Sequence, residues 1–265
     1  MSESWAIIGN GFIASKHVEG IKHIGDRILQ VCDEDLQKDT IGGIFAMNWR
    51  TMIESPYFMD IDCVAICTPN YLHYEMCDMF SDMGKRVLCE KPLVLDSSHK
   101  LPDSVFTVLQ LRHHPEVKKL KKKLPEGNVK LYVKVKRDKD YFNGWKFNNK
   151  LSGGILFNLG IHYFDLLIYL FGDEYKVLGH TTTDKIANGL LDFKGRQIEY
   201  EIELQSTDNR QDRYLQIGDK RISFSKQDNL SFENLHNKVY EDFKKGKGIT
   251  FDEAVKSIKL VEKLL

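Results

Sequence analysis

The sequence predicts an α/β protein of two domains: an amino-terminal doubly wound parallel sheet, and a carboxyl-terminal α+β domain with an open, largely antiparallel sheet. Short apolar runs alternate with helical segments through the first third of the chain, which is typical of parallel strands joined by right-handed crossovers. After residue 108 the strand-like runs follow one another with short turns, which favours antiparallel pairing. We therefore expect one domain over residues 1–108 and a second over residues 109–265.

Each expected element follows from its local pattern. In the first domain we expect strands at 5–8, 28–32, 63–67 and 86–89, and helices at 11–24 and 71–83. In the second we expect helices at 115–124, 154–171, 233–245 and 252–264, and strands at 129–136, 177–182, 189–193, 198–204, 214–217 and 221–224.

Composition narrows the class of protein. Of the 265 residues, 42% are apolar and 29% are charged, as in ordinary globular proteins. The 38 basic and 38 acidic side chains balance, which argues against a nucleic-acid-binding protein. We expect no signal peptide and no membrane span, because no apolar run reaches about 18 residues. Five cysteines without metal-ligand spacing favour a reducing, cytoplasmic setting and no bound metal.

The first expected strand runs into a turn with the pattern Gly-x-Gly-x-x-Ala at 9–14. Gly9 permits the tight turn, and Gly11 lets the backbone approach a pyrophosphate at the amino end of the next helix. We expect Phe12 and Ile13 to line the same site. Asp33 ends the second strand, where its carboxylate can accept hydrogen bonds from ribose hydroxyls and would repel a 2′-phosphate. The pattern predicts a Rossmann domain that binds NAD; the alternative is a glycine turn without a ligand.

Two further strands are followed by polar tripeptides, Thr-Pro-Asn at 68–70 and Glu-Lys-Pro at 90–92. Ligands of open parallel sheets bind beyond the carboxyl ends of the strands, so both tripeptides are placed where the nicotinamide end of a cofactor would lie. The expected cofactor contacts here are Thr68, Asn70, His73 and Glu90. The alternative for Lys91 is an ordinary surface Glu–Lys pair.

The helix expected at 154–171 is apolar nearly all round, yet it carries Asn158, His162 and Asp165 at spacings that share one helix face. Polar groups on a buried helix predict a pocket or buried partners. The alternative is a histidine held by hydrogen bonds in the core. Zinc is disfavoured, because no histidine or cysteine cluster supplies a third ligand.

Three other side chains are candidates of less weight. Arg112 lies at the junction of the expected domains, where it could reach a ligand. Tyr141 and Trp145 lie on a loop that contains glycine and asparagine. Such a loop could be a lid or a platform for a sugar, and equally an interface patch.

Together these motifs resemble the Gfo/Idh/MocA oxidoreductase family, which pairs a Rossmann domain with an open-sheet α/β domain. Longer strings are similar to its branch of UDP-N-acetylglucosaminuronate 3-dehydrogenases, the WlbA- and WbpB-like proteins. These strings are Pro-Asn-Tyr-Leu-His at 69–73, Cys-Glu-Lys-Pro-Leu-Val-Leu at 89–95, Leu-Gln-Leu-Arg at 109–112, Ser-Gly-Gly-Ile at 152–155 and Leu-His at 235–236. Asn158 stands where many other family members have aspartate, and this branch has asparagine as well.

The resemblance implies an NAD-dependent sugar-nucleotide dehydrogenase that oxidises the 3-hydroxyl of a UDP-N-acetyl-hexosaminuronic acid to a 3-keto sugar, in surface-polysaccharide biosynthesis. It implies that Lys91 and His162 meet at the reacting hydroxyl and that one of the two is the base. The implied substrate contacts are Lys91, Arg112, Tyr141, Trp145, Asn158 and His162. A homo-oligomer, dimer or tetramer, is also implied, and a keto acid that reoxidises NADH is allowed.

Two other functions stay open. The same fold could oxidise another UDP-sugar, such as UDP-N-acetylglucosamine, or a polyol. Alternatively, the protein could sense NAD or a sugar without catalysis, although the presence of both Lys91 and His162 argues against this. The chain is also short for the family between residues 33 and 61 and between 94 and 104, which puts its stability and assembly in question.

Overall fold

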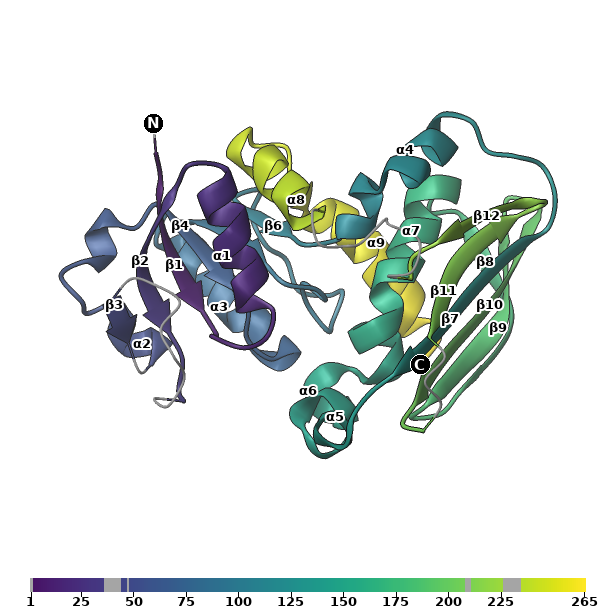
Figure 1. Cartoon of the computed structure of the whole chain (residues 1–265), viewed down its shortest axis with the longest axis horizontal. Coiled ribbons are helices and arrows are strands. Elements are labelled where there is room, and N and C mark those ends of the chain that lie inside the picture. The colour runs from purple at the N-terminus through teal and green to yellow at the C-terminus, as the bar shows by residue number, and fades with distance from the viewer. Residues whose placement is uncertain (1, 36–43, 47, 208–210, 226–234) are drawn as a thin grey trace. The chain divides into compact units, whose positions relative to one another are not determined.

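The computed structural model describes residues 2–35, 44–46, 48–207, 211–225 and 235–265 (Figure 1). The chain divides into two compact units. The first unit comprises Met1–Val94, Ser98–Val108 and Glu233–Glu253, and the second comprises Leu95–Ser97, Leu109–Phe232 and Ala254–Leu265. Residues 233–253 thus belong to the first unit, whereas we expected them in the second domain.

The first unit is built on a seven-stranded sheet with the order β13-β6-β5-β4-β1-β2-β3. All neighbours are parallel except β13 and β6, and the order of β1–β6 is that of doubly wound dinucleotide-binding folds. The strands are β1 (Ser4–Ile8), β2 (Arg27–Cys32), β3 (Ile44–Ala46), β4 (Cys63–Ile66), β5 (Arg86–Cys89), β6 (Val105–Thr107) and β13 (Ile249–Thr250). The helices are α1 (Ala14–His23), α2 (Trp49–Met52), α3 (His73–Asp82) and α8 (Leu235–Lys244), with short 3₁₀ turns at Phe58–Asp60 and Asn70–Leu72. The expected parallel sheet is confirmed.

Helix α8 belongs to the first unit because its apolar side chains complete that core. The Tyr240 and Phe243 rings lie 5.2 and 5.0 Å from Trp5 of β1. Gly20 of α1 allows this packing, because a Cβ there would lie 2.1 Å from the Tyr240 ring. These contacts join residues more than 200 positions apart, so no local pattern in the sequence predicts them.

The second unit is built on a six-stranded sheet with the order β12-β11-β7-β10-β9-β8. Only β7 and β10 pair in parallel, so the expected open, largely antiparallel sheet is confirmed. The strands are β7 (Val129–Lys136), β8 (Tyr175–Thr182), β9 (Ile186–Phe193), β10 (Arg196–Gln205), β11 (Asp212–Ile217) and β12 (Lys220–Ser223). The helices are α4 (Pro115–Lys122), α5 (Lys139–Asn143), α6 (Asn149–Ser152), α7 (Ile161–Phe171) and α9 (Phe251–Glu262), with 3₁₀ turns at Gln110–His113 and Trp145–Phe147.

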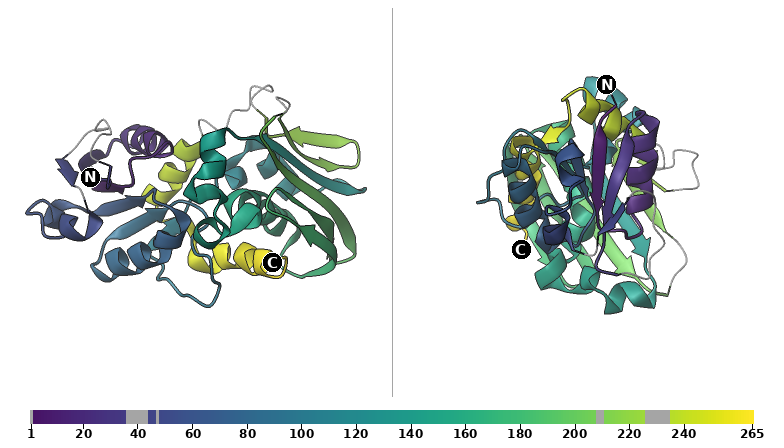
Figure 2. Two further views of the ribbon diagram at one scale, coloured as in Figure 1. Left: turned by 90° about the horizontal axis from the view of Figure 1, so that it is seen from below. Right: turned by 90° about the vertical axis from the view of Figure 1, so that its left-hand side faces the viewer.

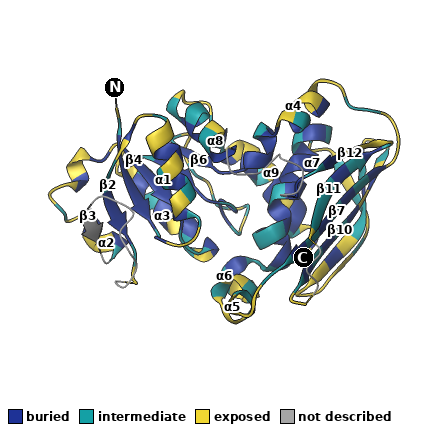
Figure 3. Cartoon of the chain, viewed as in Figure 1, coloured by how far each residue is buried: buried dark blue, intermediate teal, exposed yellow. Residues whose placement is uncertain are grey.

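Helices α7 and α9 lie on one face of this sheet (Figure 2). Strand β7 shows the resulting alternation. Val129, Leu131, Val133 and Val135 are buried, and the residues between them are half-buried. Figure 3 colours the chain by this burial. Odd-numbered residues of β7 therefore face the helices.

The helical segment Asn149–Phe171 has a mean hydropathy of 1.5 over an 18-residue window, enough by length and composition to cross a membrane. Our sequence-based expectation rested on uninterrupted apolar runs and so did not single out this segment, which contains a few polar residues. Within the structure 67% of that window is buried, as in the core helix of a soluble protein.

Candidate functional site

The glycine-rich turn after β1 has the geometry that dinucleotide binding requires. Gly9 has a φ of +90°, and a Cβ there would lie 2.7 Å from the Cys67 carbonyl oxygen. A Cβ on Gly11 would meet no protein atom within 4 Å. Gly9 is therefore needed by the fold itself, whereas Gly11 leaves open space beside the backbone, where a pyrophosphate would fit.

Two further features of this turn fit a nucleotide. No side-chain hydrogen bond caps the amino end of α1, and uncapped helix ends of this kind are where anions bind. Asp33, directly after β2, accepts a hydrogen bond of 2.6 Å from the Asn10 N–H, which places its carboxylate at the turn. Of the other expected contacts, Phe12 is 88% exposed and Ile13 packs partly into the core.

The loops after β4 and β5 are tied together by His73. Its Nδ1 lies 2.6 Å from the Pro92 carbonyl oxygen and its Nε2 lies 3.0 Å from that of Thr68. The ring is fully buried, and burial lowers its pKa. The structure thus gives His73 a bracing role rather than the exposed position that a cofactor contact would need. Asn70 is also buried, and Thr68 is half-buried.

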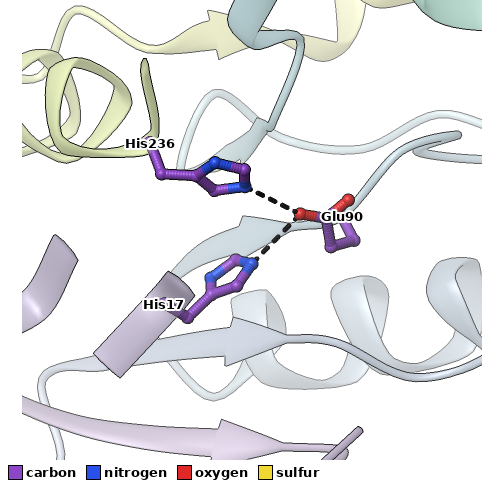
Figure 4. A group of neighbouring side chains, drawn as sticks. All are labelled: His17, Glu90 and His236. Carbon is purple, nitrogen blue, oxygen red and sulfur yellow. Dashed lines mark hydrogen bonds and ion pairs between the residues drawn. The ribbon is translucent and has the colours of Figure 1, made fainter. Parts of the chain in front are cut away.

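Glu90 is the centre of a buried cluster with His17 of α1 and His236 of α8 (Figure 4). Its Oε1 atom lies 3.1 Å from His17 Nε2 and 3.5 Å from His236 Nε2. His17 Nδ1 lies 2.8 Å from the Tyr240 hydroxyl. Burial alone would raise the pKa of Glu90, but hydrogen bonds from both histidines hold it well below its usual range.

This cluster is a donor set that could hold a metal ion, with its three ligand atoms within 4.8 Å of one another. The sequence indicated no such group, because its members lie on three distant segments. The separations between nitrogen and oxygen are hydrogen-bond distances, so the two imidazoles satisfy the carboxylate.

Lys91 directly follows this cluster and is half-buried. Its backbone N–H donates to Glu90 Oε2 at 3.3 Å. The cluster therefore fixes the backbone from which the Lys91 side chain extends.

In the second unit, the helix expected at 154–171 contains a wider π-helical turn at Leu156–Gly160 before α7. A π turn holds more residues than an α turn, so Asn158 departs from regular α-helical spacing to His162 and Asp165, which share α7. Asn158 and His162 are half-buried, whereas Asp165 is fully buried.

Asp165 forms an ion pair with Arg112. The guanidinium Nε and Nη2 donate to the two carboxylate oxygens at 2.9 and 2.7 Å. Both side chains are buried, so this fork is a structural ion pair inside the second unit. The substrate contact expected of Arg112 would have to compete with that pair.

The expected aromatic loop is a pair of short helices held against the π turn. Asn158 Nδ2 donates to the Tyr141 hydroxyl at 2.7 Å and to the Lys146 carbonyl oxygen at 3.1 Å. Trp145 begins the 3₁₀ turn of the same segment and is half-buried. The structure therefore brings Asn158 and Tyr141 together, with Trp145 close in sequence.

Two cations in this region were missed by sequence reasoning. Arg137 directly follows β7, and its guanidinium carbon lies 5.5 Å from the Tyr141 ring centroid. Arg213 of β11 hydrogen-bonds Tyr163, the neighbour of His162 on α7. A signal was present: Arg137 continues the odd-numbered, inward-facing positions of β7.

Comparison with known families decides the relationship. Residues 4–106 match the model for the NAD-binding Rossmann fold of the oxidoreductase family Gfo/Idh/MocA, and residues 127–192 match that for its C-terminal alpha/beta domain. The chain belongs to the Gfo/Idh/MocA family. These matches confirm the expected family, fold class and NAD-binding domain, and relate the chain to NAD-dependent dehydrogenases.

Named relatives include dehydrogenases of inositol, levoglucosan and D-glucosides. An inositol 2-dehydrogenase of Rhizobium meliloti is 28% identical over 66% of this chain and 56% of its own length. The chain spans about half the length of such curated relatives.

Solved structures match over nearly the whole chain. The WlbA (WbpB) dehydrogenase of Thermus thermophilus, in complex with NAD and alpha-ketoglutarate, is 27% identical with a TM-score of 0.86, covering 99% of this chain and 94% of that one. Its complex with NAD and UDP-GlcNAcA gives 26% identity and a TM-score of 0.84, covering 98% and 93%.

Proposed function

We propose that this protein catalyses NAD-dependent oxidation of the 3-hydroxyl of a UDP-N-acetyl-hexosaminuronic acid. The observation that carries the proposal is the likeness, over nearly the full chain, to a dehydrogenase whose structure holds NAD and UDP-GlcNAcA. The motif residues Lys91 and His162 are both present, directly after β5 and in the first turn of α7. The product, a 3-keto sugar nucleotide, would serve polysaccharide biosynthesis in the cytoplasm.

The first unit would hold the cofactor. Gly9, Gly11 and the amino end of α1 would bind the pyrophosphate, and the Asp33 carboxylate would accept hydrogen bonds from the ribose hydroxyls. When bound, NAD⁺ supplies the acceptor for the hydride that leaves the carbon. The uncapped helix end and the open space at Gly11 both fit this group.

Lys91 and His162 would handle the hydroxyl proton. In this proposal the Lys91 ammonium polarises the oxygen and His162 takes the proton, because an imidazole accepts protons near neutral pH. Asn158 and Tyr141, already joined by a hydrogen bond, would contact the sugar together with Trp145.

A keto acid is a fitting second substrate, because a Thermus thermophilus chain similar to this one holds NAD together with alpha-ketoglutarate. Reduction of its carbonyl would return bound NADH to NAD⁺. We also propose a homo-oligomer, as the family resemblance implies.

The test is a panel of candidate substrates assayed for NADH formation: UDP-GlcNAcA, UDP-N-acetylglucosamine and myo-inositol. We expect turnover with UDP-GlcNAcA. Lys91→Met should reduce kcat about 10²- to 10⁴-fold while NAD still binds, because the change removes proton-transfer assistance and leaves the nucleotide site intact. Near-normal turnover by that variant would refute the roles assigned here.

The inositol dehydrogenases among the relatives favour a polyol as the second candidate substrate. Turnover of myo-inositol but not of UDP-GlcNAcA would select it. NAD binding without turnover across the panel would select a sensor.

A further inference from the structure

The inward face of the second unit's sheet carries a cation that the fold does not neutralise. Arg137 extends the register of β7 by one residue, because its N–H donates to the Gln205 carbonyl oxygen at 2.8 Å. It has the same parity as the buried residues Val133 and Val135, so its side chain leaves the sheet on the helix-covered face.

A second arginine lies on the same face. Arg213 of β11 pairs with Val133 of β7, and cross-strand partners point to the same side of a sheet. Its hydrogen bond to Tyr163 places it beside α7, next in sequence to His162. The two arginines are close enough for the charge of Arg213 to act on Arg137.

The surroundings of Arg137 supply little negative charge. Its guanidinium lies over the Tyr141 ring, and its Nη1 donates a hydrogen bond of 3.0 Å to the Lys136 carbonyl oxygen. The Asp138 carboxylate accepts from the Tyr141 N–H, as the cap of α5. Among the residues that the structure describes, no carboxylate lies within 4.0 Å of the Arg137 guanidinium. Burial, and then the charge of Arg213, lower the pKa of Arg137.

Arg137 is half-buried and has no carboxylate beside its guanidinium, so its charge is only partly compensated in the free protein. An oxyanion that accepts hydrogen bonds from two of its N–H groups would stabilise it. Arg137 contacts the ring of Tyr141, and the Tyr141 hydroxyl in turn accepts a hydrogen bond from Asn158. Tyr141 and Asn158 are two of the side chains that we assign to the sugar. From the sequence we expected Arg112 to contact the substrate, but Arg112 is paired with Asp165.

We propose that Arg137, with Arg213 beside it, forms the subsite that binds an anionic oxygen group of the substrate. This inference rests on the proposed function, in which the substrate carries two such groups, the uronate carboxylate and the diphosphate. Either group offers two oxygens to the fork of the guanidinium. The subsite would make an anionic sugar nucleotide a better substrate than a neutral polyol.

The experiment compares Arg137→Gln with the parent on UDP-GlcNAcA and on UDP-N-acetylglucosamine. Loss of a charged hydrogen bond should raise KM for UDP-GlcNAcA about 10- to 100-fold, with a smaller change in kcat. If the partner is the carboxylate, KM for UDP-N-acetylglucosamine stays within threefold; if it is the diphosphate, both values rise together. Lys136→Gln is the matched control, because the neighbouring side chain lies on the opposite face and should leave both KM values unchanged.

A stability measurement separates ligand binding from a structural role. Removal of a half-buried charge that has no carboxylate partner should leave the midpoint of thermal unfolding of the free protein unchanged or raised. It should also reduce the rise in that midpoint that UDP-GlcNAcA gives. Unchanged KM values, or a free protein that Arg137→Gln destabilises strongly, would overturn the subsite. The proposed function fails on a different result, namely no NADH from either sugar nucleotide with the parent protein.

Discussion

Gly9 and Gly11 differ in why each must be glycine. Gly9 adopts a left-handed conformation and lies against the Cys67 carbonyl group, so the folded chain itself requires it. Gly11 lies outside that region of φ, and a Cβ there would meet no protein atom. Its small size matters only to something that approaches from outside the chain.

Alanine at each position should therefore give opposite results. Gly9→Ala should destabilise the fold by about 1–3 kcal/mol, because a non-glycine residue is strained there. Gly11→Ala should leave the free energy of unfolding unchanged or slightly raised, yet raise the Kd for NAD roughly tenfold or more. Denaturant unfolding and calorimetric titration with NAD measure the two effects. Parent-like NAD affinity in Gly11→Ala would contradict the placement of the pyrophosphate.

The glycine-rich turn and Asp33 could be predicted because the pattern that marks them lies within a short stretch of sequence. Their prediction required only an apolar strand, the glycine pattern at 9–14 and the distance in sequence from that pattern to Asp33. Arg137 and Arg213 could not be predicted as a pair, because they meet through the register of β7 with β11.

Helix α8 shows, at the scale of elements, how distant parts of the chain complete one unit. It packs Tyr240 and Phe243 on β1, places Lys244 Nζ 2.7 Å from Asp26 Oδ1, and brings His236 to Glu90. The short strands β3, β6 and β13 were also unpredicted, because two or three residues carry too little pattern. The alternating strand β7 was predicted with its bounds, whereas β9 begins three residues before the expected strand.

Loss of the His236 side chain should lower the free energy of unfolding, because it removes a contact that joins α8 to Glu90. His236→Ala would leave the buried Glu90 carboxylate with His17 as its one imidazole donor, which should cost about 1–3 kcal/mol of unfolding free energy. The matched control is His23→Ala, which removes a solvent-exposed contact of 2.9 Å between His23 of α1 and Glu241 of α8 and should cost less than about 1 kcal/mol. Denaturant unfolding measures both. Equal losses would show that Glu90 does not depend on His236.

At the scale of the whole molecule, acid should destabilise the fold. Burial lowers the pKa of His17 and His73 below the ordinary value of 6.5, so the unfolded chain binds protons there that the folded chain does not. The free energy of unfolding therefore rises with pH in this range and falls as pH drops below about 6.5. The depressed pKa of Glu90 acts in the same direction at lower pH: its contribution is present above about 4.5 and is lost as the pH falls towards its folded-state value.

We expect the unfolding midpoint in urea to be lower at pH 5.5 than at pH 7.5. The midpoint of His17→Gln should depend less on pH than that of the parent, because the substitution removes one of these buried imidazoles. A midpoint that is equal or higher at pH 5.5 would contradict the lowered pKa of these buried histidines.

The most direct test of the proposed reaction follows the transferred hydrogen itself. UDP-GlcNAcA labelled with deuterium on carbon 3 is incubated with NAD⁺ and the protein, and the reduced cofactor is examined by mass spectrometry. Oxidation at the 3-hydroxyl predicts NADH that carries one deuterium, together with a 3-keto sugar nucleotide that has lost it. Unlabelled NADH, or no NADH at all, would contradict that reaction.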